Sequence, residues 1–346
     1  PGFLYVWFEI PSAGPHSILA TTQYLPNRDY IILDGFSQSS SKEGAKTFGP
    51  EYMIDILDNA SLTACFYTFG DNIDIKGFKI QNYDIPILIF SNSVGVFGNY
   101  IINGNYGITV DASMSFCNIG SQIGKDRNYI VSCSAKAMEI GGSYHSIRGN
   151  FIGVEPTGTA NGNNEGIDLN GALYSTVGGN SVNEGNLICS STLYGIRVAN
   201  SSNSYVFNNV LGVNPTYSST VGFENNSGIE VENSNLNYIG SFLYPHGGNV
   251  IVSSLGQGLI IHNAEENTIQ GNIIGLFPDG VTSGAIGTNG IRVSGNTSYN
   301  NFGDFVYTDF RNVIGNCNGS GYYSDATSGS SNNFVFNYIG TDVSGT

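Results

Sequence analysis

The 346-residue chain is poor in charge and rich in small turn-forming residues: 11% of it is charged, and it contains 47 glycines and 42 asparagines. The scarcity of Lys and Glu argues against a helical bundle, while 40% hydrophobic residues, with 12% aromatic residues, argue against disorder. The net charge of −15 and the total of only 12 Lys and Arg argue against nucleic-acid binding, which needs a basic surface.

Residues 1–52 are predicted to form the opening strands and first coils of a repeat structure, and residues 53–346 one continuous domain of it. The first apolar segment, residues 3–10, has strand length, and the chain stops at Thr346 within a repeat. Because the sequence starts without Met inside that segment, we expect a piece of a longer polypeptide. No apolar run approaches the roughly 18 residues of a membrane-spanning helix.

An internal repeat with a period of about 62 residues organises the rest of the chain. A Gly-Ile-x-Val or Gly-Ile-x-Leu motif starts at Gly107, Gly166, Gly228 and Gly290. An Asn-x-Ile motif starts at Asn128, Asn186, Asn249 and Asn312, and an Asn-x-Ile-Gly or Asn-x-Leu-Gly motif at Asn150, Asn209, Asn272 and Asn337. Segments related to the first motif start halfway between its copies, at Ala137, Gly195, Gly258 and Gly321. The basic unit therefore has about 30 residues.

Each unit is predicted to be one coil of a solenoid with three short strands. In the Gly-Ile-x-Val motif the apolar positions alternate, so two side chains point into the coil and x points outward. One coil cannot bury its apolar side chains alone, but stacking covers them above and below. The predicted inward column is Ile108, Met138, Ile167, Ile196, Ile229, Leu259 and Ile291.

The repeated asparagines are predicted to be structural rather than catalytic. Asn tolerates the left-handed conformation that turns between strands require. Its amide can also bond the amide in the next coil, which forms a ladder. The predicted ladder residues are Asn128, Asn150, Asn186, Asn209, Asn249, Asn272, Asn312 and Asn337.

Two segments carry a family resemblance: Asn-Thr-Ile-Gln-Gly-Asn-Ile-Ile-Gly at 267–275 and Asn-Tyr-Ile-Gly-Thr-Asp-Val-Ser-Gly-Thr at 337–346. They resemble the N-x-I-x-G-N-x-I-G-T-D-x-x-G-T pattern of bacterial secreted and cell-surface proteins with the pectin-lyase-like fold. Residues 8–18 and 32–38 resemble the opening segment of the same group. The resemblance implies an all-β, right-handed parallel β-helix of about ten coils, located outside the cell. It specifies the fold rather than the function, because lyases, hydrolases, adhesins and phage fibres share this fold.

The outward residues of the Gly-Ile-x-Val strands form the candidate site. If the protein is an enzyme, its catalytic residues are expected among Asp168, Arg197, Glu230, Glu232, His262 and Arg292. Paired carboxylates can act as acid and base on a glycosidic bond, or an Arg can abstract a proton beside a metal-neutralised uronate. The alternative is an exposed ladder of mixed charge, with Arg197 between Asp168 and Glu230, whose pairs each contribute ~0–1 kcal/mol.

Several absences favour the ladder. The sequence has no acidic cluster of the calcium-dependent pectate-lyase type, and it has neither the Asp-Asp nor the Arg-x-Lys of polygalacturonases. His16 and His145 lack metal-ligand spacing and are expected in turns or on the surface. The five cysteines show no metal or redox spacing and are interpreted as small buried residues. We therefore expect no metal and no cofactor.

The favoured hypothesis is a non-enzymatic extracellular rod, structural or adhesive, in a surface or filament protein. Its expected partners are glycans or a host or neighbouring cell surface, and copies are expected to associate end to end unless flanking domains cap them. Tyrosines near predicted loops and strand edges, such as Tyr194, Tyr205 and Tyr217, could stack on sugars or pack loops onto the coil. The alternative is a polysaccharide lyase or glycoside hydrolase, and a third possibility is a phage-type fibre.

Overall fold

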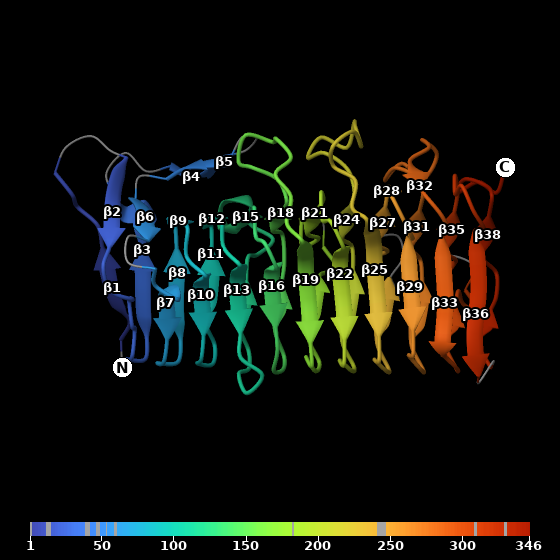
Figure 1. The fold of residues 1–346 in the computed structure, drawn as a ribbon, viewed down its shortest axis with the longest axis horizontal. Helices are drawn as coiled ribbons and strands as arrows, with labels where there is room; N and C mark the ends of the chain where they lie inside the picture. Colours follow the sequence, from blue (N-terminus) through green and yellow to red (C-terminus); the bar gives the residue numbers. More distant parts are fainter. Residues whose placement is uncertain are drawn as a thin grey trace.

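The computed structural model describes residues 2–11, 15–38, 42–45, 49–52, 54–58, 61–181, 183–240, 247–307, 310–328 and 331–346. It is a right-handed parallel β-helix whose coils are stacked along one long axis, with the two termini at opposite ends (Figure 1). Helical structure in the described part of the chain is limited to short 3-10 turns, such as η1 (Gly35–Ser37) and η2 (Gly124–Asp126). None of the described residues forms a helix that is long and apolar enough to cross a membrane.

Three parallel sheets, each with its strands stacked along the long axis, form the walls of the helix. Sheet 1 contains β7 (Ala64–Thr68), β10 (Ile85–Ile89), β13 (Tyr106–Val110), β16 (Lys136–Ile140), β19 (Glu165–Asn170), β22 (Tyr194–Ala199), β25 (Ser227–Glu232), β29 (Leu259–His262), β33 (Ile291–Asn296) and β36 (Tyr322–Ser328). Sheet 2 contains β1 (Leu4–Trp7), β3 (Ile31–Asp34), β8 (Ile73–Lys76), β11 (Gly95–Phe97), β14 (Asn118–Ile119), β17 (Ser146–Ile147), β20 (Thr176–Gly178), β23 (Tyr205–Phe207), β26 (Tyr238–Gly240), β30 (Thr268–Gln270), β34 (Asn301–Phe302) and β37 (Asn333–Phe334). Sheet 3 contains β2 (His16–Ala20), β6 (Ile54–Asp58), β9 (Lys79–Gln81), β12 (Tyr100–Ile102), β15 (Tyr129–Val131), β18 (Phe151–Ile152), β21 (Leu187–Ile188), β24 (Val210–Leu211), β27 (Val250–Ile251), β31 (Ile273–Ile274), β35 (Val313–Ile314) and β38 (Tyr338–Ile339).

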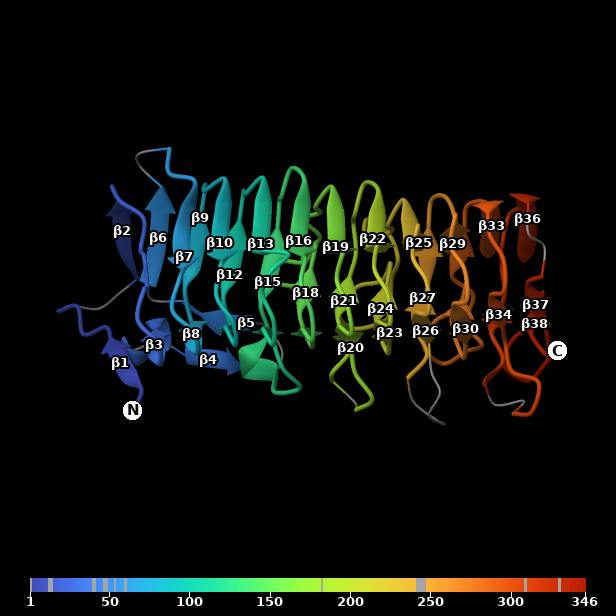
Figure 2. The ribbon, with the colours of Figure 1, turned by 90° about the horizontal axis from the view of Figure 1, so that it is seen from below.

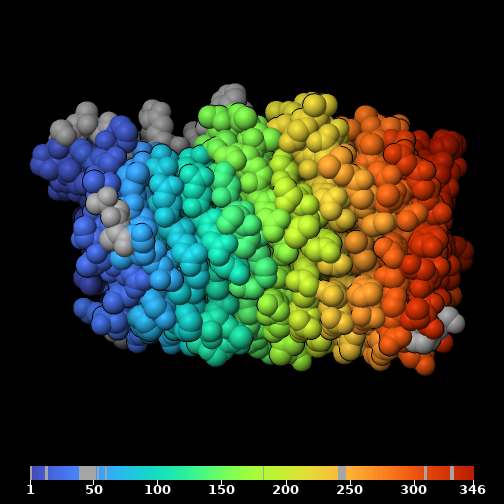
Figure 3. All heavy atoms as spheres, viewed as in Figure 1, coloured from blue at the N-terminus to red at the C-terminus, as the bar shows by residue number. Residues whose placement is uncertain are grey.

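Each complete coil visits sheets 1, 2 and 3 in turn, as β19, β20 and β21 do before β22 starts the next coil (Figure 2). In the space-filling view successive coils appear as successive colour bands along the rod (Figure 3). Two short pairs lie outside the sheets: β28 (Ser253–Ser254) with β32 (Ala285–Ile286), and the antiparallel β4 (Lys42–Ala45) and β5 (Gly49–Glu51). The predicted three strands per coil are confirmed, and the sheets contain 10 to 12 strands.

The predicted inward column of sheet 1 is confirmed and forms part of the main core. Its seven residues, from Ile108 to Ile291, face one another in register on neighbouring strands, and each is 0% exposed. Full burial of such a side chain contributes roughly 1.5–3 kcal/mol, so this column holds successive coils together. Four of the five cysteines are buried and Cys317 is partly buried, and all five are free thiols.

The asparagine ladder lies at the corner between sheets 2 and 3. The Nδ2 of each predicted member donates to the Oδ1 of the next, at 2.8–3.0 Å, in one run from Asn128 to Asn337. The same Oδ1 also accepts the backbone N–H of the preceding member. Asn99 extends the ladder by one coil and was missed in the sequence.

A second ladder, which the sequence analysis also missed, lies at the corner between sheets 1 and 2. Asn237, Asn267, Asn300 and Asn332 bond one another as the first ladder does. Ser204, Ser175 and His145 continue it towards the N-terminus. His145 lies in the turn between β16 and β17, which agrees with the expected turn or surface position, and it is buried there at 2% exposure. Its Nδ1 accepts the backbone N–H of Cys117 at 3.2 Å, and this role requires a buried acceptor.

The loops alternate in length from one coil to the next, which explains the 62-residue period. Long loops follow sheet 3 at residues 153–164, 212–226 and 275–290, and shorter ones precede it at 120–128 and 179–186. The loops after sheet 3 fold over its outer face and bury a second apolar cluster there. The members of this cluster that are fully covered are Val154, Leu187, Cys189, Val213 and Val252.

Candidate functional site

The outer face of sheet 1 carries a dense group of ionisable side chains, which we call the charged patch. Its members are Lys136, Glu139, Glu165, Asp168, Tyr194, Arg197, Glu230 and Glu232. They come from four consecutive coils, through β16, β19, β22 and β25. The parallel register places Asp168 opposite Arg197 and Arg197 opposite Glu230, as predicted.

Arg197 is the centre of the patch. Its Nη1 lies 3.6 Å from Oδ2 of Asp168, and its Nε lies 3.3 Å from Oε2 of Glu230. Its Nη2 forms a close ion pair with Glu232. One guanidinium therefore holds three carboxyl groups from two neighbouring strands, which brings Glu230 and Glu232 to the same side chain.

Lys136 closes the patch on the other side. Its Nζ lies 2.6 Å from Oδ2 of Asp168 and 2.7 Å from Oε1 of Glu139. The same Asp168 oxygen thus contacts both cations of the patch, because Arg197 approaches it from the next coil. This arrangement fixes the Asp168 carboxyl between Lys136 and Arg197.

Asp168 corrects the prediction of an exposed ladder. Its side chain is 0% exposed, and Oδ1 has no hydrogen-bond partner among the described residues. Burial raises the pKa of Asp168 above its ordinary value, and the hydrogen bond and charge of Lys136 partly offset this. Glu230 is also buried, so the patch includes carboxyl groups withdrawn from water rather than a solvated row of charges.

Glu230 and Glu165 have protonation properties suited to acid–base chemistry. Burial raises the pKa of Glu230, and the neighbouring charge of Glu232 raises it further, although Arg197 opposes this. Burial also raises the pKa of Glu165, whose Oε2 has no hydrogen-bond partner in the described part of the chain. Tyr194 bonds Glu230, and burial, followed by the charge of Glu230, raises the pKa of the tyrosine to about 12. Raised carboxyl pKa values occur at catalytic acids.

Two of the predicted site residues lie outside the charged patch. Ile260 occupies the register position between Glu230 and Arg292, and Arg292 pairs instead with Asp325 at 2.8 Å. His262 lies opposite Glu232 on the next strand, but its Nδ1 contacts Oγ of Ser294 at 3.0 Å. Of the six predicted site residues, the first four therefore contact one another in the patch, while His262 and Arg292 contact other partners.

Lys136, Glu165 and Tyr194 are patch residues that the sequence analysis missed. If the side chains alternated strictly between inward and outward from the x position, these three would point inward. The alternation breaks at the Gly or Ala that follows each of them. A Cβ added at Gly166 would lie 2.1 Å from the carbonyl oxygen of Gly195 and 2.8 Å from Cγ2 of Ile188, so that position faces the packed interior. The residue before it turns outward as a result. A charge or Tyr just before the Gly or Ala of successive units was the available signal.

The described residues contain no group of three or more His, Cys, Asp or Glu side chains placed to hold a metal ion. The patch carboxyls other than Glu165 are ion-paired to Lys136 or Arg197.

Comparisons with solved structures identify the same fold in carbohydrate enzymes. The A-module of the mannuronan C-5 epimerase AlgE6 from Azotobacter vinelandii is 12% identical, covers 93% of this chain and 87% of its own, and has a TM-score of 0.52. DFA-IIIase from Arthrobacter chlorophenolicus A6, in complex with GF2, is 10% identical, with coverages of 84% and 81% and a TM-score of 0.46. No family model and no curated protein matches the sequence. At these identities the likeness shows the parallel β-helix and not a shared activity.

Proposed function

We propose that the charged patch binds a neutral glycan and processes it by acid–base chemistry, with Glu230 as the proton donor. The observation that carries this proposal is the arrangement of Glu230, a buried carboxyl with a raised pKa, beside Glu232 on a single guanidinium. A carboxyl with a raised pKa next to a second, ion-paired carboxyl is the combination that glycoside cleavage uses.

The charge of the patch supports a neutral rather than an anionic substrate. Five carboxyl groups, those of Glu139, Glu165, Asp168, Glu230 and Glu232, surround two cations, Lys136 and Arg197. An excess of carboxylates repels a polyuronate, whereas the hydroxyl groups of a neutral sugar can donate to carboxylates and accept from Lys and Arg. The mannuronan C-5 epimerase is an example of carbohydrate chemistry on this fold. We do not propose its substrate for this chain.

The roles within the patch follow from the contacts. Glu230 donates the proton to the leaving oxygen, and Tyr194 orients it through their hydrogen bond. Glu232, held by Arg197, is the base that takes a proton from the water attacking the sugar, so that a new C–O bond forms as the glycosidic bond breaks. Asp168 and Lys136 act indirectly, because Asp168 is fully buried, pairs with Lys136 and fixes the position of Arg197.

The test is a search for turnover on neutral glycans with the full chain. β-Glucans, xylan, mannan, inulin and α-glucans are incubated with the protein, and new oligosaccharides are detected by mass spectrometry. Glu230→Gln should abolish turnover while circular dichroism and glycan binding stay unchanged. Asp325→Asn is the matched control, because it removes an ion-paired carboxyl from the same sheet outside the patch. Turnover that survives Glu230→Gln, or a clear preference for polyuronates, would contradict the proposal.

A second candidate function is a non-catalytic extracellular or cell-surface rod that adheres to glycans or neighbouring copies. The observation that favours it is the pair of hydrogen-bond ladders, which stiffen the stack at two of its corners over many coils. Two results together would favour this rod over the enzyme. The protein would bind glycans but turn over none of those tested, and sedimentation would show concentration-dependent end-to-end association.

A further inference from the structure

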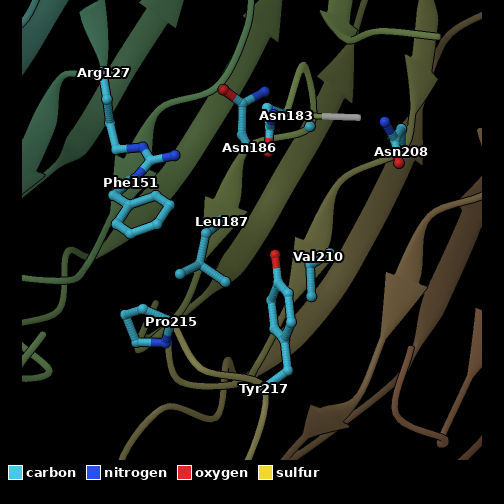
Figure 4. A pocket seen from close by; sticks show the side chains of 10 residues that line it. Arg127, Phe151, Asn183, Asn186, Leu187, Asn208, Val210, Pro215 and Tyr217 are labelled. Carbon is cyan, nitrogen blue, oxygen red and sulfur yellow. The ribbon is translucent and has the colours of Figure 1, made fainter. Parts of the chain in front are cut away.

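A cleft of about 450 Å³ lies over the outer face of sheet 3, away from the charged patch on sheet 1 (Figure 4). The loop 212–226 forms one wall, and residues from the loops before β15, β21 and β24 form the other. Phe151, Leu187 and Val210 face the cleft from neighbouring strands and give it an apolar floor. The rim carries polar groups and one cation, so the cleft combines an apolar surface with a few polar anchors, as small-molecule sites do.

Arg127 is the cation at this rim. Its guanidinium lies over the ring of Phe151, 3.8 Å from the centroid, and its Nε donates to the carbonyl oxygen of Gly149 at 3.1 Å. Among the described residues Arg127 has no carboxylate partner, whereas Arg197 has three. An oriented guanidinium that has no counter-ion in the described part of the chain is suited to a planar anion such as a carboxylate.

Tyr217 stands opposite Arg127 in a backbone conformation that disfavours it. Its φ is +54°, and the same position in the sister loops, five residues after Gly153 and Gly275, is occupied by Gly158 at +86° and Gly280 at +71°. All three residues donate their N–H to the same turn position, three residues back. A tyrosine in a left-handed turn that glycine fills elsewhere in the chain indicates a use for its side chain.

The Tyr217 ring and hydroxyl contribute to the cleft. Figure 4 shows the hydroxyl end reaching towards Leu187 and Val210, with Arg127 on the far side of Leu187. Burial of this end raises the pKa of Tyr217, and the charge of Arg127 partly offsets the rise. Asn208 adds a polar anchor: its Nδ2 donates to the carbonyl oxygen of Ser181 at 2.9 Å, which leaves Oδ1 as an acceptor.

We propose that this cleft binds a carboxylate-bearing sugar, independently of any activity of the charged patch. Arg127 pairs with the carboxylate, and the apolar floor and the Tyr217 ring pack against the C–H face of the sugar ring. Asn208 and the Tyr217 hydroxyl bond its hydroxyl groups. The charges of the two sites are opposite and favour different ligands: one is an acidic patch, and the other offers Arg127, which has no carboxylate partner among the described residues.

The test is calorimetric or NMR titration of the full chain with D-glucuronate, D-glucose and benzoate. We expect glucuronate to bind more tightly than glucose, which lacks the carboxylate, and than benzoate, which lacks the hydroxyl groups. Arg127→Gln should weaken glucuronate binding by about tenfold or more. Arg311→Gln is the matched control, because Arg311 lies over Tyr338 on the same sheet at 4.1 Å but does not line the cleft.

Tyr217→Gly is a second test variant that is expected to fold, because the sister loops already have glycine at this position. It should weaken glucuronate binding and leave the fold intact. The proposal would be overturned if glucose or benzoate bound as tightly as glucuronate. It would also be overturned if the Arg127 and Tyr217 variants both kept full affinity for glucuronate. Glu230→Gln should not change glucuronate binding, so failure of the charged-patch proposal is distinguishable from failure of this one.

Discussion

Lys136 and Asp168 form a 2.6 Å ion pair between neighbouring coils, and the carboxylate in it is fully buried. The pair also affects the position of Arg197, because Oδ2 of Asp168 lies 3.6 Å from Nη1 of that guanidinium. A buried charge is tolerated only while it is paired. The patch is therefore one electrostatic unit, in which removal of any partner changes the others.

Lys136→Met should destabilise the protein by about 3 kcal/mol, because it leaves Asp168 buried with only the longer contact to Arg197. The double variant Lys136→Met, Asp168→Asn should recover much of this loss, since the amide has no charge to desolvate. Urea unfolding of the two single variants and the double variant measures the coupling. Additive losses would show that the pair is not coupled.

Asn209→Ala should cost about 2–3 kcal/mol, because it removes the acceptor of two Asn186 donors and the donor to Asn249 from a buried ladder. Asn337→Ala is the comparison, since that residue lies at the last coil of the described ladder and is only partly buried. Its cost should be clearly smaller in the same urea unfolding experiment. Equal costs would mean that the ladder does not act through burial.

Stability should depend on pH through His145. Burial lowers the pKa of His145 to about 4, from an ordinary value near 6.5. The folded state then keeps this group neutral while the unfolded state binds a proton, so its contribution is complete above about pH 6.5 and is lost as the pH falls towards 4.

His145→Asn is the informative variant, because Asn fills the corresponding ladder positions at Asn237 and Asn267 and supplies the acceptor that Cys117 needs. The difference in unfolding free energy between wild type and variant should change by about 3 kcal/mol between pH 7 and pH 4. The patch carboxyls act equally in both proteins and cancel in this difference. A difference that stays constant with pH would refute the role of His145.

The repeat made most of the fold predictable, because Ile167 and its equivalents recur once per coil. Each copy supports the same strand assignment in the other coils. Arg197 between Asp168 and Glu230 followed from the same alternation. Lys136 did not, since the close packing around Gly166 and its equivalents reverses the alternation at a point that sequence periodicity does not show. His262 lies opposite Glu232, but its ring contacts Ser294 rather than the patch.

The cleft on sheet 3 was beyond prediction for another reason. Arg127 and Tyr217 are 90 residues apart in the sequence, in a loop before sheet 3 and a loop after it. Only the stacking of coils brings them to one place. What the sequence did contain was a local exception: Tyr217 replaces the glycine found at the same position of the sister loops, at Gly158 and Gly280.

That exception gives a last prediction, which concerns stability rather than binding. A left-handed conformation costs an L-residue such as Tyr217 roughly 1–2 kcal/mol, and glycine relieves it. Glycine also loses about 0.5–1 kcal/mol through its freer unfolded chain, and it gives up the packing of the ring. Tyr217→Gly should therefore change the unfolding free energy by no more than about 1 kcal/mol in either direction. Tyr217→Ala keeps the strain and loses the ring, so it should be the less stable of the two variants. Thermal unfolding of both variants without ligand measures this order, and an alanine variant as stable as the glycine variant would show that the turn imposes no strain.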